Sequence, residues 1–71
     1  MTKDELIAQT KTWCEAEKLI YVDDVTVGRD TIILVMGKDA ATKLDGFLDS
    51  LSLKHTTSMA VADAIGSYVT L

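Results

Sequence analysis

The chain has 71 residues, which is enough for one domain but leaves a small core, because a chain of this size buries only about 60% of its unfolded surface. It is 48% hydrophobic, contains no proline and carries a net charge of −4. These values argue against a disordered chain, a basic nucleic-acid-binding surface and a protein that lies on an anionic membrane.

The N-terminal segment Met1–Leu6 carries acidic residues and no apolar run, so we expect no signal peptide. Cys14 is the only cysteine, so no disulfide can form within the chain. Both observations predict a cytoplasmic protein. Small domains usually need a disulfide, a metal or oligomerisation for stability, and only oligomerisation is indicated here.

The first predicted element is a helix over about Lys3–Lys18. Thr2 and Glu5 have the T-x-x-E spacing of a capping box. Residues on one arc of this helix form its expected buried side: Leu6, Ile7, Thr10, Trp13 and Cys14. We expect Trp13 to pack across the next element, and the alternative is an exposed anchor for a partner.

Leu19–Met36 is predicted to form a β-hairpin. Two runs rich in β-branched residues, Leu19–Val27 and Thr31–Met36, flank a Gly28-Arg29-Asp30 connection. The second run is apolar on both faces, which is typical of a central or doubly covered strand. Helices can cover one face of this hairpin, and an open edge remains for pairing with a second copy.

Asp23 and Asp24 interrupt the first strand of this hairpin. Because neighbouring strand residues face opposite sides, one carboxylate should point toward the core unless a bulge lets both reach solvent. Together with Asp30 they resemble ligands for Ca²⁺ or Mg²⁺, but the downstream glutamate of an EF-hand is missing. We therefore expect no metal site and interpret the charges as protection of a strand edge.

A second helix is predicted from an N-cap at Asp39 to about Leu51. Its apolar stripe consists of Ala40, Leu44, Phe47, Leu48 and Leu51. Asp45 and Asp49 lie one turn apart on the opposite side. They form either a solvated face or an acidic ridge that binds a basic partner.

The last segment is predicted to form a third helix, which begins near Thr56–Ser58 and ends at about Tyr68. Before it, Leu53–His55 is a linker or a short strand that would make the sheet three-stranded. The third helix would be apolar almost all round, so we expect part of it to contact another subunit or a partner protein. The candidate self-association residues are Ser58, Val61, Ala62, Ile65, Gly66 and Val69.

The sequence offers little from which to build a catalytic site. His55 is the only histidine, and a general base also needs a nucleophile and an orienting group. Cys14 falls on the predicted buried arc, where a free thiol usually acts as a small hydrophobic group. We therefore predict no catalytic, cofactor-binding or metal-binding residues and no cofactor.

The predicted fold is a single α+β domain over residues 1–71. It has the order helix, hairpin, helix, helix, with the helices packed on one face of a short antiparallel sheet. We expect a homodimer, formed through the third helix or through a sheet edge, and no direct contact with nucleic acid or membrane.

The favoured function is a small, acidic, non-enzymatic regulator or inhibitor that occupies the surface of another protein. One version is an anti-defence inhibitor encoded by a phage or mobile element, which would mimic nucleic-acid charge. Its partner-binding carboxylates would be Asp23, Asp24, Asp45 and Asp49. The alternatives are an oligomer with a ligand pocket near Trp13, Tyr21 and Tyr68, and a small enzyme.

Overall fold

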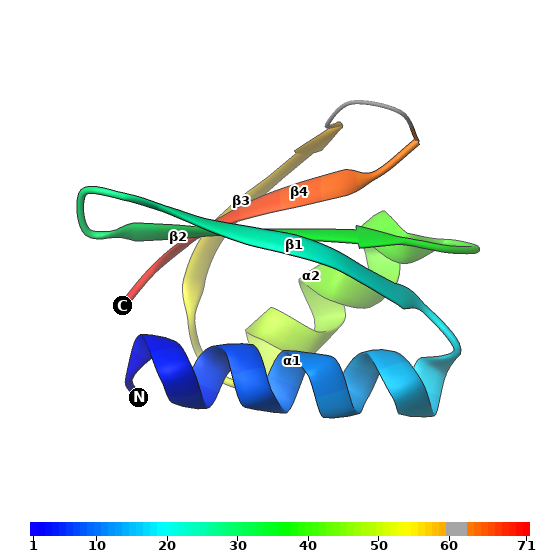
Figure 1. The fold of residues 1–71 in the computed structure, drawn as a ribbon, viewed down its shortest axis with the longest axis horizontal. Helices are drawn as coiled ribbons and strands as arrows, with labels where there is room; N and C mark the ends of the chain where they lie inside the picture. Colours follow the sequence, from blue (N-terminus) through cyan, green and yellow to red (C-terminus); the bar gives the residue numbers. More distant parts are fainter. Residues whose placement is uncertain (60–62) are drawn as a thin grey trace.

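The computed structural model describes residues 1–59 and 63–71. It confirms an α+β fold, with the elements α1 (Lys3–Glu17), β1 (Ile20–Val27), β2 (Asp30–Met36), α2 (Ala40–Ser50), β3 (Lys54–Met59) and β4 (Ile65–Thr70). All pairings are antiparallel, in the strand order β1-β2-β4-β3. Figure 1 shows α1 and α2 together on one side of this sheet.

α1 begins as the sequence predicts. The backbone N–H of Glu5 donates to the Thr2 hydroxyl at 3.2 Å, and the backbone N–H of Thr2 donates to the Glu5 carboxylate at 3.0 Å. The hydrogen bond from the Thr2 backbone N–H lowers the pKa of the Glu5 carboxyl because it favours the charged form. The capping box thus satisfies orphan donors at the helix start and fixes where α1 begins.

The core lies between the helices and the sheet. Alternate residues of β2 face it, so Thr31, Ile33 and Val35 are buried. They meet apolar side chains from both helices and from β4, namely Leu6, Cys14, Leu44, Leu48 and Val69. No helix within the described ranges is long and apolar enough to cross a membrane.

The third helix is wrong over the described residues, because Lys54–Met59 and Ile65–Thr70 are strands. A strand near Leu53–His55 does form, but it is longer than expected and belongs to a four-stranded sheet. The helical pattern depended on counting Ala and Gly as apolar. The β-branched and aromatic residues of the same segment instead pair with the free edge of β2.

Two connections differ in detail from the prediction. The hairpin turn has two residues, since Val27 pairs with Asp30, and Gly28 has a φ of 62°. Glycine at the first central position is typical of a type II′ turn. Asp39 does stand at the start of α2, but its φ is 57° and its side chain makes no capping hydrogen bond.

Gly37 ends β2 in a conformation that other residues rarely adopt. Its φ is 146°, and a Cβ placed there would lie 2.4 Å from Leu19 Cδ2. Leu19 belongs to the core, so its side chain cannot swing away without losing packing. Both the backbone and the space therefore require glycine at position 37.

Replacing Gly37 with alanine should lower the free energy of unfolding by about 1–3 kcal/mol, since strain and a core displacement add. Gly46→Ala is the matched control. Nothing lies within 4 Å of its Cβ position on α2, and alanine is the better helix former, so it should stabilise by about 0.5–1 kcal/mol. Urea denaturation of both variants measures the difference, and equal midpoints would contradict it.

Candidate interaction surface

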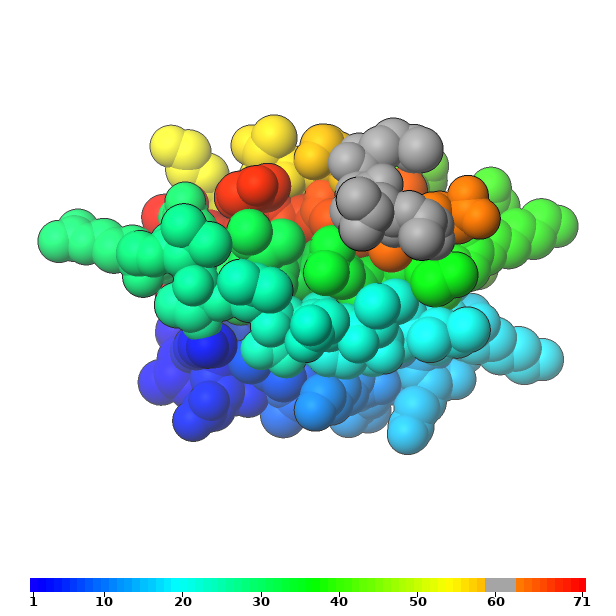
Figure 2. All heavy atoms as spheres, turned by 45° about the horizontal axis from the view of Figure 1, so that its top comes forward, coloured from blue at the N-terminus to red at the C-terminus, as the bar shows by residue number. Residues whose placement is uncertain are grey.

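The side of the sheet away from the helices is unusually apolar. The strand register and the alternation of side chains along each strand show which apolar residues of β1, β2 and β4 point to this side. We call this set the open face, and it consists of Ile20, Val25, Val27, Ile32, Leu34, Met36 and Tyr68. Figure 2 brings this side forward, and side chains of β1 and β2 cross the centre of the view.

The open face is most exposed along β1 and at Tyr68, and its β2 side chains are partly covered. Ile20 is 62% exposed, Val27 55%, Tyr68 47% and Val25 42%. Antiparallel sheets with one solvated face normally alternate apolar inward with polar outward. On this side β3 presents Lys54, Thr56 and Ser58, and the register also places Asp23, Asp30 and Thr70 there. Most of the other positions of β1, β2 and β4 on this side are apolar.

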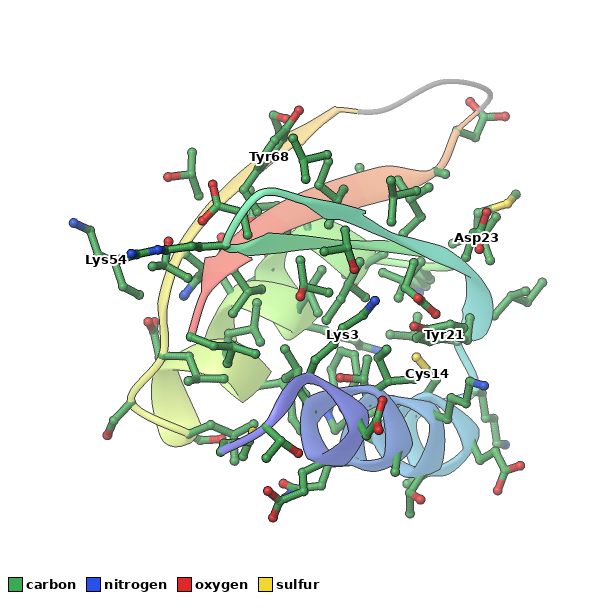
Figure 3. The ribbon with its side chains drawn as sticks, turned by 60° about the vertical axis from the view of Figure 1, so that its left-hand side comes forward. Lys3, Cys14, Tyr21, Asp23, Lys54 and Tyr68 are labelled. Carbon is green, nitrogen blue, oxygen red and sulfur yellow. The ribbon has the colours of Figure 1, made fainter. Side chains whose placement is uncertain are left out.

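Tyr68 shows the direction of the open face. It is the cross-strand partner of Ile32 on one side and of Thr56 on the other. In Figure 3 it stands on the side of the sheet away from α1, whereas Tyr21 and Cys14 lie between the sheet and α1. The sequence signal for this surface was the apolar character of both sides of β2, one of which the structure leaves open.

β1 does contain a bulge, because its register shifts between Tyr21 and Asp23 with Val22 as the extra residue, but the bulge does not bring both carboxylates to solvent. Asp23 is exposed, and Asp24 turns toward the helix side, where its carboxylate accepts a hydrogen bond from the Tyr21 hydroxyl at 2.8 Å. Burial and this carboxylate raise the pKa of Tyr21, so it stays a protonated donor.

The other two predicted carboxylates belong to a hydrogen-bond network between α2 and the sheet. One Asp45 oxygen lies 3.1 Å from Nε2 of His55 and accepts the Thr57 hydroxyl at 2.5 Å. The His55 Nδ1 lies 2.9 Å from the Leu53 carbonyl, so both ring nitrogens face oxygen acceptors. Asp49 is farther away, at 3.9 Å from Nε2, and is largely exposed.

The four carboxylates therefore do not form one acidic surface. β1 and β3 are the two opposite edges of the sheet. Asp23 and Asp24 lie at the β1 edge, and Asp45 and Asp49 lie on α2 next to β3. Asp45 also forms hydrogen bonds within the chain, to His55 and Thr57. The contact between Asp45 and His55 joins α2 to β3, which is a structural role for His55.

Thr57 links this network to a fully buried hydroxyl. Its Oγ1 lies 2.9 Å from Ser67 Oγ, and because its own proton goes to Asp45, Ser67 is the donor in that pair. Removing the Thr57 hydroxyl would leave Ser67, which has no exposed surface, without this partner. The stability contributed by this network therefore depends on the single hydroxyl oxygen of Thr57.

Thr57→Val should lower the free energy of unfolding by about 1–3 kcal/mol, the cost of an unpaired buried hydroxyl. Thr56→Val makes the same change on the exposed side of the same strand and should alter stability by less than about 0.5 kcal/mol. Adding Ser67→Ala to Thr57→Val should recover part of the loss. Thermal denaturation of the four proteins tests this, and equal effects at positions 56 and 57 would contradict it.

The predicted self-association residues do not share a helical face over the described residues. Ser58 and Gly66 are cross-strand partners in β3 and β4. Val69 is fully buried in the core, and Ile65 packs against it from β4. Val61 and Ala62 lie outside the described residues.

The aromatic residues of the predicted ligand pocket are also separated. Trp13 stacks on Phe47 of α2, with ring centroids 4.5 Å apart and planes at 16°. Tyr21 lies on the helix side of the sheet and Tyr68 on the open face. Trp13 thus joins the two helices instead of packing across the hairpin.

Two hollows accompany these helices. Trp13 and Phe47 border an open groove of about 430 Å³ with small residues of α1. A second hollow of about 540 Å³ lies between α1 and β1, beside Lys11, whose ammonium stands 5.3 Å from the centre of the Tyr21 ring. The lining of the second hollow includes Cys14, which is buried, and the carboxylate of Asp24, which accepts the Tyr21 hydroxyl.

The cysteine and the acidic residues do not build a metal centre in the part of the chain that the structure describes. No group of three or more His, Cys, Asp or Glu side chains there is placed to hold an ion. Cys14 is buried in the core, and burial raises the pKa of its thiol.

No family model, curated protein or solved structure matches this chain.

Proposed function

We propose that this chain is a small, non-enzymatic protein-interaction module that binds through the open face of its sheet, as a regulator or inhibitor would. The observation that carries the proposal is the run of apolar side chains on the side of the sheet opposite the helices. Large apolar patches on a small protein mark sites where another surface binds.

The chemistry of the patch supports a protein as the ligand. Tyr68 offers an aromatic ring with a polar tip beside Ile32, whose neighbour on the other side is Val25. Aromatic and aliphatic groups dominate the centres of protein interfaces. A charge-mimicking inhibitor would need one acidic surface, and the carboxylates predicted for that role lie at opposite edges of the sheet.

The test compares threonine substitutions on the open face with one at the β1 bulge. Val25 lies on the open face and is 42% exposed, while Val22 lies at the bulge and is 43% exposed beside the α1–β1 hollow. Threonine keeps the shape and strand preference of valine but makes the surface polar. Val25→Thr/Ile32→Thr removes apolar surface from the open face, and Val22→Thr is the matched control.

Tagged chain would be cross-linked in extracts of its native cells, and bound proteins, including an untagged second copy, would be identified. The proposal predicts a specific protein that wild type and Val22→Thr retain and Val25→Thr/Ile32→Thr loses at least tenfold. Retention of the same protein by all three, or no specific protein with wild type, would contradict it.

A further inference from the structure

We infer that the occupant of the open face is a second copy of this chain, so that two sheets pack face to face with their helices outward. The inference rests on the proposed function and names its partner. It differs from the sequence expectation, which placed self-association on a helix or a sheet edge. Three features of the described residues support it.

The first feature is area. The exposed parts of the open-face side chains amount to roughly 500 Å² of apolar surface, near the upper end of what monomeric proteins leave uncovered. Interfaces are about 60% apolar, so a patch of this size corresponds to about 800 Å² in total per partner. That is the area each partner contributes to a standard stable interface.

The second feature is charge. The charged groups on and beside this side of the sheet cancel, because Asp23 and Asp30 are acidic and Arg29 and Lys54 are basic. Most other acidic residues lie on the helices, on the opposite side of the sheet: Asp4, Glu5, Glu15, Glu17, Asp45 and Asp49. A neutral apolar surface fits an identical one, and this arrangement keeps the helical charges of the two copies apart.

The third feature is that β2 has one buried apolar side and one uncovered apolar side. Ile33 and Val35 are fully buried, whereas Ile32 and Leu34, which alternate with them, are only partly covered. A second sheet at the usual distance of about 10 Å would bury Ile32 and Leu34 as α1 and α2 bury their neighbours. The result is a closed two-fold pair in which each copy presents the same surface.

The experiment is light scattering over a range of concentrations, with the wild type, Val25→Thr/Ile32→Thr and Val22→Thr. We expect a molar mass of twice 7.7 kDa for the wild type and for Val22→Thr. For the open-face double variant we expect a dissociation constant raised at least tenfold. If that variant fails to fold by circular dichroism, the single substitution Val25→Thr replaces it, against the same control.

Amide hydrogen exchange distinguishes the open face from the β1 edge. In the face-to-face pair the outer amides of β1 exchange at the same rate above and below the dissociation constant. Slowed exchange at these amides in the dimer would mean edge pairing and overturn the inference.

A wild type that stays monomeric, a double variant that dimerises as strongly as the wild type, or a control that dissociates equally would also overturn it. A different result would refute the second copy and leave the proposed function standing. In that result the wild type is monomeric but captures another protein, and the Val25→Thr/Ile32→Thr variant no longer captures it.

Discussion

Replacing Ile33 with alanine is expected to lower the free energy of unfolding by about 2–5 kcal/mol, the range for truncating a large buried aliphatic side chain. Ile33 has no exposed surface and lies in the core between β2 and the helices. Domains of this kind are stable by only about 5–15 kcal/mol, so a substantial part of the total would be lost. Guanidinium denaturation, followed by circular dichroism, measures the change.

Ile32→Ala is the matched control, because Ile32 is the next residue and faces the other side of the same strand. The measurement is made at dilutions that favour the monomer. The free energy of unfolding lost by Ile32→Ala should be less than half of that lost by Ile33→Ala, because less of the Ile32 side chain is buried. Equal losses at the two positions would contradict the assignment of one covered side and one open side to β2.

Trp13→Ala is expected to cost about 2–4 kcal/mol, somewhat less than for a fully buried aromatic residue. Trp13 is half-buried, and its ring stacks on Phe47, so the substitution removes an aromatic contact between α1 and α2. Chemical denaturation measures the loss. A double-mutant cycle with Phe47→Ala should give a coupling of about 0.5–1.5 kcal/mol.

Gln9→Ala, on the exposed side of α1, serves as the control and should change stability by less than about 0.5 kcal/mol. A Trp13→Ala protein as stable as the wild type would contradict the structural role. It would favour the alternative in which this side chain anchors a partner.

The first half of the fold could be predicted because its signals are local. The capping box at Thr2 and Glu5, the turn at Gly28 and the charged interruption at Asp23 each act within a few residues, and each occurs in the structure, with the turn one residue shorter than predicted. Short-range hydrogen bonding and backbone preference decide such features, so distant parts of the chain scarcely affect them.

The second half failed because its structure depends on a distant partner. Ile65–Thr70 fits a helical wheel when small residues are counted as apolar, and only the free edge of β2 makes it a strand. The open face was missed for a related reason. The apolar pattern of β2 was interpreted as a strand covered on both sides, and a periodic pattern does not tell how many layers cover it.

The strand order also bears on how the chain folds. Both hairpins join neighbours in sequence, but β2 and β4 are brought together from far apart, as the Thr70 hydroxyl shows by donating to Asp30 across 40 residues at 3.0 Å. Closing so long a segment, with α2 inside it, costs chain entropy before any pairing compensates for it. The central junction of the sheet should therefore limit the folding rate, whereas substitutions at the β1–β2 turn should leave that rate nearly unchanged.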